Sequence, residues 1–148
     1  MERIYSQEIL ELAAALRSGE RLEAPDATVR RTARICGSVV EVDVCVKGDV
    51  VTGFGQEVNA CALGQASASI LAANVLGAGV AEIRTVRDQV AAMLTEGAPP
   101  PEGRWADYRF LLPVRDYPAR HGSTLLALNA TVECLENIAQ ARAGAHGS

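Results

Sequence analysis

Apolar and polar residues alternate with a period of two in the middle of the chain. In VVEVDVCVKGDVVTGFGQEV, residues 39–58, the apolar positions Val40, Val42, Val44 and Val46 alternate with Glu41, Asp43, Cys45 and Lys47. Such alternation is typical of a strand with one buried face, and Lys47–Asp49 predicts a hairpin turn into a return strand at Val50–Val58. A weaker pattern near Val29–Ile35 predicts another strand. We therefore expect a small antiparallel three-stranded sheet over about residues 29–59, with one face solvated.

Helical spacing replaces the alternation on both sides of this predicted sheet. Apolar residues recur every three or four positions, and glycines follow the first three of these segments. The pattern predicts helices at about residues 5–17, 62–77, 80–95 and 118–142, so that the helical part covers about 62–142, and a frayed tail at 143–148. The fold class is α+β, with the helices covering one face of the sheet, and we expect residues 1–148 to form a single domain.

Composition narrows the classes of partner. Hydrophobic residues make up 49% of the 148 residues, charged residues 22%, and the net charge is −4. An acidic balance argues against a nucleic-acid or anionic-membrane surface. The first ten residues, MERIYSQEIL, contain two glutamates and no apolar core, so we expect no secretory signal and a cytoplasmic location.

Four cysteines, Cys36, Cys45, Cys61 and Cys134, show no CxxC spacing and are more consistent with thiols or metal ligands than with a disulfide framework. Cys61 follows the predicted return strand and precedes a helix, whose N-terminus stabilises a thiolate. Cys36 lies on a loop before the main strand, and antiparallel pairing predicts that it meets Cys61 at one end of the sheet. From spacing alone, a buried apolar role is an open alternative for both, and it is the main expectation for Cys45 and Cys134.

One histidine lies close to a helix start. His121 belongs to RHGST, two residues before Ser123. A ligand role requires the helix to begin after His121, and the alternative is a surface histidine beside a Ser123 helix cap. With two histidines in the chain, the serines lack a convincing base, which argues against a hydrolase triad.

Four motifs together resemble a known family. YSQEILELA, CGS at Cys36, ACALGQASASIL around Cys61 and YPARHGSTLLAL from Tyr117 occur in the order expected of iron–sulfur cluster assembly scaffolds of the IscU/SufU/NifU N-terminal group. The chain is most similar to the SufU-like branch, from about Tyr5 to Ala139. In that family three cysteines and an aspartate bind zinc or a nascent [2Fe–2S] cluster, and the scaffold receives sulfur from a cysteine desulfurase.

The resemblance also implies an altered ligand set. The first two family cysteines fall on Cys36 and Cys61, whereas the aspartate position holds Ser38 and the third cysteine position holds Ser123. A neutral serine is a poorer ligand for zinc or ferrous iron than a thiolate or a carboxylate. His121 is the nearest candidate for a replacement ligand.

Three functions follow as hypotheses. The first is a scaffold or carrier that is not an enzyme and that binds iron, zinc or an iron–sulfur cluster through Cys36, Cys61 and His121. The second is a metal-free protein that modulates a cysteine desulfurase. The third is a sulfurtransferase that accepts a persulfide on Cys61. The expected partners are a cysteine desulfurase and other assembly proteins, with no nucleic acid and no membrane.

Overall fold

Three antiparallel strands form the sheet in the computed structural model, which describes residues 5–146. The strands β1 (Ala27–Thr32), β2 (Val39–Lys47) and β3 (Val50–Asn59) lie side by side in that order. Val42 of β2 pairs with Val29 on one side and with Gln56 on the other. Gly48 has a φ of +64° in the turn between β2 and β3, where glycine is the favoured residue. The predicted three-stranded sheet and its hairpin are confirmed.

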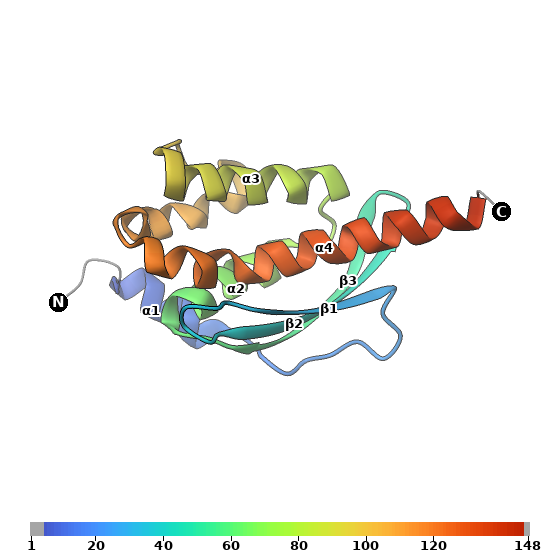
Figure 1. Cartoon of the computed structure of the whole chain (residues 1–148), viewed down its shortest axis with the longest axis horizontal. Coiled ribbons are helices and arrows are strands. Elements are labelled where there is room, and N and C mark those ends of the chain that lie inside the picture. Colours follow the sequence, from blue (N-terminus) through green and yellow to red (C-terminus); the bar gives the residue numbers. More distant parts are fainter. Residues whose placement is uncertain (1–4, 147–148) are drawn as a thin grey trace.

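The helices form two layers on one side of this sheet (Figure 1). The layer next to the strands contains α2 and α4, and the outer layer contains α3 and the 3-10 segment η1, while α1 packs mainly against α2. Within residues 5–146, no helix combines the length and the apolarity that a membrane span requires. The bounds are α1 Gln7–Ala15, α2 Ala62–Asn74, α3 Val80–Glu96, η1 Gly103–Asp116, η2 Pro118–Arg120 and α4 His121–His146.

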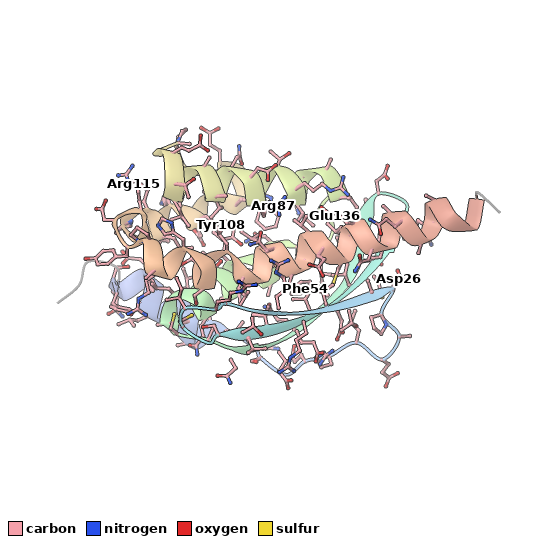
Figure 2. All side chains as sticks on the ribbon, in the orientation of Figure 1. Asp26, Phe54, Arg87, Tyr108, Arg115 and Glu136 are labelled. Atoms are coloured by element: carbon pink, nitrogen blue, oxygen red, sulfur yellow. The ribbon has the colours of Figure 1, made fainter. Side chains whose placement is uncertain are left out.

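The core lies between the sheet and the helices. The alternating valines of β2 are each at most 7% exposed and face α4, while α2 packs against β3 and α4. These two helices bury Leu63, Ile70, Leu128 and Leu135. Tyr108 of η1 is fully buried, and its hydroxyl donates a hydrogen bond to the Ser67 backbone oxygen at 3.4 Å (Figure 2). Arg87 of α3 points toward α4 and bonds Asn129 at 3.2 Å. Because α4 runs along the whole sheet, its first turn is placed at one defined sheet end (Figure 1).

Residues 16–26 cover the part of the second face around Asp43, and the rest of that face is solvated as predicted, with Thr28, Arg30 and Glu57 exposed. Gly19 and Glu20 bond the backbone of Gln56 at the free edge of β3, and Asp26 bonds the backbone of β2. A Cβ on Gly55 would lie 2.5 Å from the Glu20 oxygen, so glycine makes room for this segment. Asp43 lies beneath it and is 1% exposed.

The helix ends differ from the predicted bounds. α1 begins after Ser6, whose Oγ accepts a hydrogen bond from the Ile9 N–H at 3.2 Å, and ends two residues early at Ala15. The second helix ends at Asn74 and not at Gly77. α4 starts at His121, after the single turn η2, and continues to His146. The predicted tail is therefore helical at 143–146, and residues 147 and 148 lie outside the described residues.

The buried carboxylate of Asp43 generates a stability prediction. It accepts hydrogen bonds from the Arg21 side chain, from Thr28 Oγ1 at 2.6 Å and from the Leu22 N–H at 3.1 Å. The Arg21 guanidinium is the largest cause that lowers the Asp43 pKa, to about 2. The pKa of Asp43 is lower in the folded chain than in the unfolded chain, so the ionised carboxylate stabilises the fold. This stabilisation is present above pH ~4 and is lost as the pH falls through about 2.

We expect Asp43→Asn to lower the free energy of unfolding at pH 7 by about 2–3 kcal/mol, measured by urea denaturation. The matched control is Asp49→Asn in the exposed hairpin turn, which should change it by less than ~0.5 kcal/mol. The difference between wild type and Asp43→Asn should shrink below pH 4. An equal loss for both variants, or a loss independent of pH, would contradict this assignment.

Candidate functional site

Antiparallel pairing brings the two candidate cysteines to one end of the sheet. Val39 at the start of β2 pairs with Asn59 at the end of β3, so Cys36 and Cys61 flank the same pair of strand ends. Cys36 lies in the turn between β1 and β2, where Gly37 adopts a φ of +73° and the Ala33 N–H donates to the Ser38 oxygen at 2.8 Å. Cys61 is the residue directly before α2 and has an extended backbone. The predicted meeting of the two cysteines is confirmed.

Two serine hydroxyls lie between the two sulfurs. The Cys36 thiol donates to Ser38 Oγ at 3.1 Å, Ser38 Oγ lies 3.3 Å from Ser123 Oγ, and Ser123 Oγ lies 3.3 Å from Cys61 Sγ. Ser38 is 4% and Ser123 is 2% exposed, whereas Cys36 is exposed and Cys61 is partly exposed. The four side chains therefore form one continuous chain of polar contacts, with its serines inside the protein and its thiols toward solvent.

The first turn of α4 supplies Ser123 because α2 and α4 approach closely there. A Cβ on Gly64 would lie 2.8 Å from Ser123 Oγ and 2.8 Å from the Ala60 Cβ. Glycine at this position lets the two helices meet beside Cys61. Ser123 occupies the space that the absent side chain of Gly64 leaves open.

The structure does not bring His121 to the cysteines. Its Nε2 lies 3.0 Å from the Val114 oxygen and 3.3 Å from the Arg115 oxygen, both in η1. α4 includes His121, so the loop that a ligand role requires is not formed. Ser123 is not the helix cap of the alternative hypothesis either, since it lies inside the first turn. Among residues 5–146, no three His, Cys, Asp or Glu side chains gather in a group that could hold a metal ion.

The two remaining cysteines, Cys45 and Cys134, lie away from the contacts that join Cys36 to Cys61. Cys134 of α4 is fully buried, and burial raises the pKa of its thiol to about 12. Cys45 lies on the Glu41 and Asp43 face of the sheet, as expected, and its thiol donates to the Ala24 backbone oxygen at 3.4 Å. Neither lies in the chain of contacts that joins Cys36 to Cys61.

Hydroxyl groups change the acidity of Cys36. The Ser38 side chain is the largest cause that lowers the pKa of this thiol, and the Ser123 hydroxyl acts in the same direction. Both hydroxyls can turn and donate a hydrogen bond to the sulfur once it is a thiolate. Ser123 therefore contacts the Cys61 sulfur and also lowers the pKa of the Cys36 thiol.

The amino-acid sequence matches the model of a known protein family. The model of the NifU-like N-terminal domain matches residues 4–123, a range that includes Cys36, Ser38, Cys61 and Ser123. The chain belongs to the NifU-like N-terminal domain family. The resemblance seen in its motifs is thereby confirmed.

Individual relatives agree with this NifU-like assignment. An iron–sulfur cluster assembly scaffold protein IscU from Thermotoga maritima is 28% identical over 139 residues, which cover 93% of this chain and 96% of that protein. The crystal structure of a nitrogen-fixing NifU-like protein (N-terminal) from Brucella abortus has a TM-score of 0.92 and 46% identity, covering 94% of this chain and 96% of that one.

The same fold occurs in a more distant relative. A candidate cluster assembly scaffold protein for the SUF system from Fervidobacterium islandicum has a TM-score of 0.81 at 21% identity, covering 89% of this chain and 96% of that one. The α+β fold predicted for this NifU-like domain is therefore confirmed.

Gly64 provides a test of the helix contact that positions Ser123. We expect Gly64→Ala to lower the free energy of unfolding by about 1–3 kcal/mol, because the new methyl group overlaps Ser123 and Ala60. Chemical denaturation measures this change. The control is Gly144→Ala in the exposed part of α4, where a Cβ meets nothing within 4 Å and should stabilise the helix by ~0.5–1 kcal/mol. Equal stability of Gly64→Ala and wild type would show that the fold does not require the close approach of α2 and α4 at Gly64.

Alkylation tests the effect of Ser38 on Cys36. We expect Ser38→Ala to raise the Cys36 pKa and to slow its reaction with iodoacetamide at pH 7, because the thiolate is the reacting species. Mass spectrometry of the labelled peptides gives the rate for each cysteine as a function of pH. Cys45 provides an internal control, and its rate should not change. A Cys36 rate unaffected by the substitution would contradict the assignment.

Proposed function

We propose that this chain is a scaffold or carrier in iron–sulfur cluster assembly that holds iron, zinc or a cluster as cargo at Cys36 and Cys61. The observation that carries the proposal is the continuous contact chain from Cys36 through Ser38 and Ser123 to Cys61. Thiolates are preferred ligands of zinc and of iron–sulfur clusters. The scaffold description of the Thermotoga maritima relative supports the same role. This role is that of a carrier and not of an enzyme.

The donor atoms fit the cargo in part. Two thiolates offset the charge of a divalent ion, whereas the two serines contribute neutral oxygens where the family resemblance implies an aspartate and a third cysteine. Fewer charged ligands lower the affinity, because each lost anion removes attraction at close range. We therefore infer a site that binds its cargo more weakly than the full family set and releases it more readily.

A second candidate function is a metal-free partner of a cysteine desulfurase. It is favoured by the finding that no third His, Cys, Asp or Glu joins Cys36 and Cys61 within residues 5–146. A double variant with both cysteines replaced by serine separates the two functions. If that variant binds a purified cysteine desulfurase and changes its sulfide output as the wild type does, the metal-free role is favoured.

Restoring the family ligands tests the carrier proposal. We expect wild type, prepared under anaerobic reducing conditions, to take up zinc or iron, and Cys61→Ala to lose this uptake. Ser38→Asp combined with Ser123→Cys should raise the zinc affinity roughly tenfold or more, measured by competition with a chromophoric chelator. Cys45→Ser is the control and should bind as the wild type does. Equal affinity of Cys61→Ala and wild type would contradict the proposal.

A further inference from the structure

The outer edge of β3, on the side away from β2, is covered by other segments of the chain at two places. Near the start of the strand, Val51 bonds the backbone of residues 77–78 at 2.9 and 3.0 Å. Near its end, Gln56 bonds the backbone of residues 19–20 at 2.9 and 3.1 Å. Each segment supplies one donor and one acceptor, as a further strand would. This edge therefore accepts extended backbone at both ends.

Phe54 lies between these two paired positions. The N–H and C=O groups of an antiparallel strand point alternately to its two sides, so those of Phe54 point the same way as those of Gln56 two residues later. Within residues 5–146, no segment bonds the backbone of Phe54 on this side. Unpaired backbone groups at a sheet edge are a template for another extended chain. Among the described residues, the edge thus has a gap that offers one donor and one acceptor.

A cavity of about 360 Å³ opens at this gap. Phe54 and Gln56 of β3 line it together with Leu16, which follows α1, and with Ala73 and Leu76 at the end of α2. Phe54 and Leu16 are partly buried, and Leu76 is 58% exposed. Cavities of roughly 300–1,000 Å³ with mostly apolar walls and a few polar groups are typical of binding sites. The apolar walls and the free backbone groups of Phe54 lie in the same place.

The charges around the cavity favour an electrically neutral occupant. Arg17 and Glu20 line it and lie 3.8 Å apart, with side chains that are 83% and 70% exposed. Their opposite charges cancel, and the other described residues that line the cavity carry no charge. A charged group placed against these walls would lose its hydration without gaining a partner.

The length of the gap favours a short segment over the same edge of a second copy. From Val51 to Gln56 the strand extends about 17 Å, at about 3.3 Å per residue, so about three extended residues fit between the two covering segments. β3 itself has 10 residues and is too long to pair with its own copy in this space.

We propose that the cavity beside Phe54 binds a short, extended, uncharged apolar peptide segment of a partner protein. The central residue of the segment donates its N–H to the Phe54 oxygen and accepts the Phe54 N–H, which completes the edge of β3. Residues paired across strands share a sheet face, and Phe54 pairs with the fully buried Val44 on the helix side. The side chain of the central residue therefore points toward the end of α2, where Ala73 and Leu76 line the cavity.

This cavity is separate from the cysteine site. Ala73 lies about 18 Å along α2 from Cys61, at about 1.5 Å per residue. A peptide segment beside Phe54 and cargo at Cys61 do not compete for space. The inference is therefore independent of the proposed carrier function.

An NMR titration of the ¹⁵N-labelled full chain with the neutral peptide N-acetyl-valyl-leucyl-valinamide tests the inference. We expect the Phe54 amide signal to shift and the hydrogen exchange of this amide to slow as the peptide binds. Methylation of the leucyl nitrogen removes the donor to the Phe54 oxygen and should weaken binding by roughly tenfold. A glutamyl residue in place of the leucyl residue should weaken it at least as much, because its charge meets apolar walls.

Two variants of the chain locate the binding site. Ala73→Glu places a carboxylate at the cavity wall and should weaken peptide binding by roughly tenfold. Ala73 is exposed on α2, so the fold tolerates the change. Ala139→Glu is the same substitution at an exposed position of α4 and should bind as the wild type does. Cys61→Ala should also bind the peptide normally, whatever its effect on metal uptake.

Three outcomes would overturn the inference. Equal binding of the methylated peptide would show that the cavity takes apolar groups without backbone pairing. A Phe54 amide that does not respond to millimolar peptide would show that the edge is not a binding site. A shift of the same amide with protein concentration, in the absence of peptide, would identify a second copy as the occupant.

Discussion

The close approach of α2 and α4 at Gly64 is the constraint on which the site depends. Only a residue without a Cβ leaves Ser123 within 3.3 Å of Cys61 and of Ser38. α4 itself is aligned by packing along the sheet, so its first turn meets α2 where β3 ends. The packing of α4 in the core therefore determines how close Ser123 lies to Ser38 and Cys61.

The thiols and the serines of the contact chain differ in their exposure to solvent. The thiols reach solvent, whereas the serines are buried and lie between them. Hydroxyls stand at two positions where the family resemblance implies an aspartate and a cysteine, and this lowers the negative charge of the site. On the proposed carrier function, this lower charge means that the site holds its cargo more weakly than the full family ligand set does.

Periodicity predicted the three-stranded sheet and the starts of α2 and α3, because the valines of β2 and the apolar stripes of these two helices indicate which side is buried. The same pattern could not show that residues 16–26 cover part of the second face, since Asp43 looks like a solvent-facing residue until Arg21 is placed beside it. Antiparallel pairing predicted that Cys36 and Cys61 meet. The orientation of His121 depends on the carbonyl groups of η1, a segment without a regular repeat, so the sequence could not exclude it as a ligand.

X-ray absorption at the zinc edge of the loaded wild-type chain tests the central claim most directly. The account predicts sulfur neighbours at about 2.3 Å from the bound ion, supplied by Cys36 and Cys61. Cys61→Ala should lose the bound ion and, with it, the sulfur scattering, whereas Cys45→Ser should match the wild type. An imidazole signature from His121, or four sulfur neighbours from two chains, would contradict it.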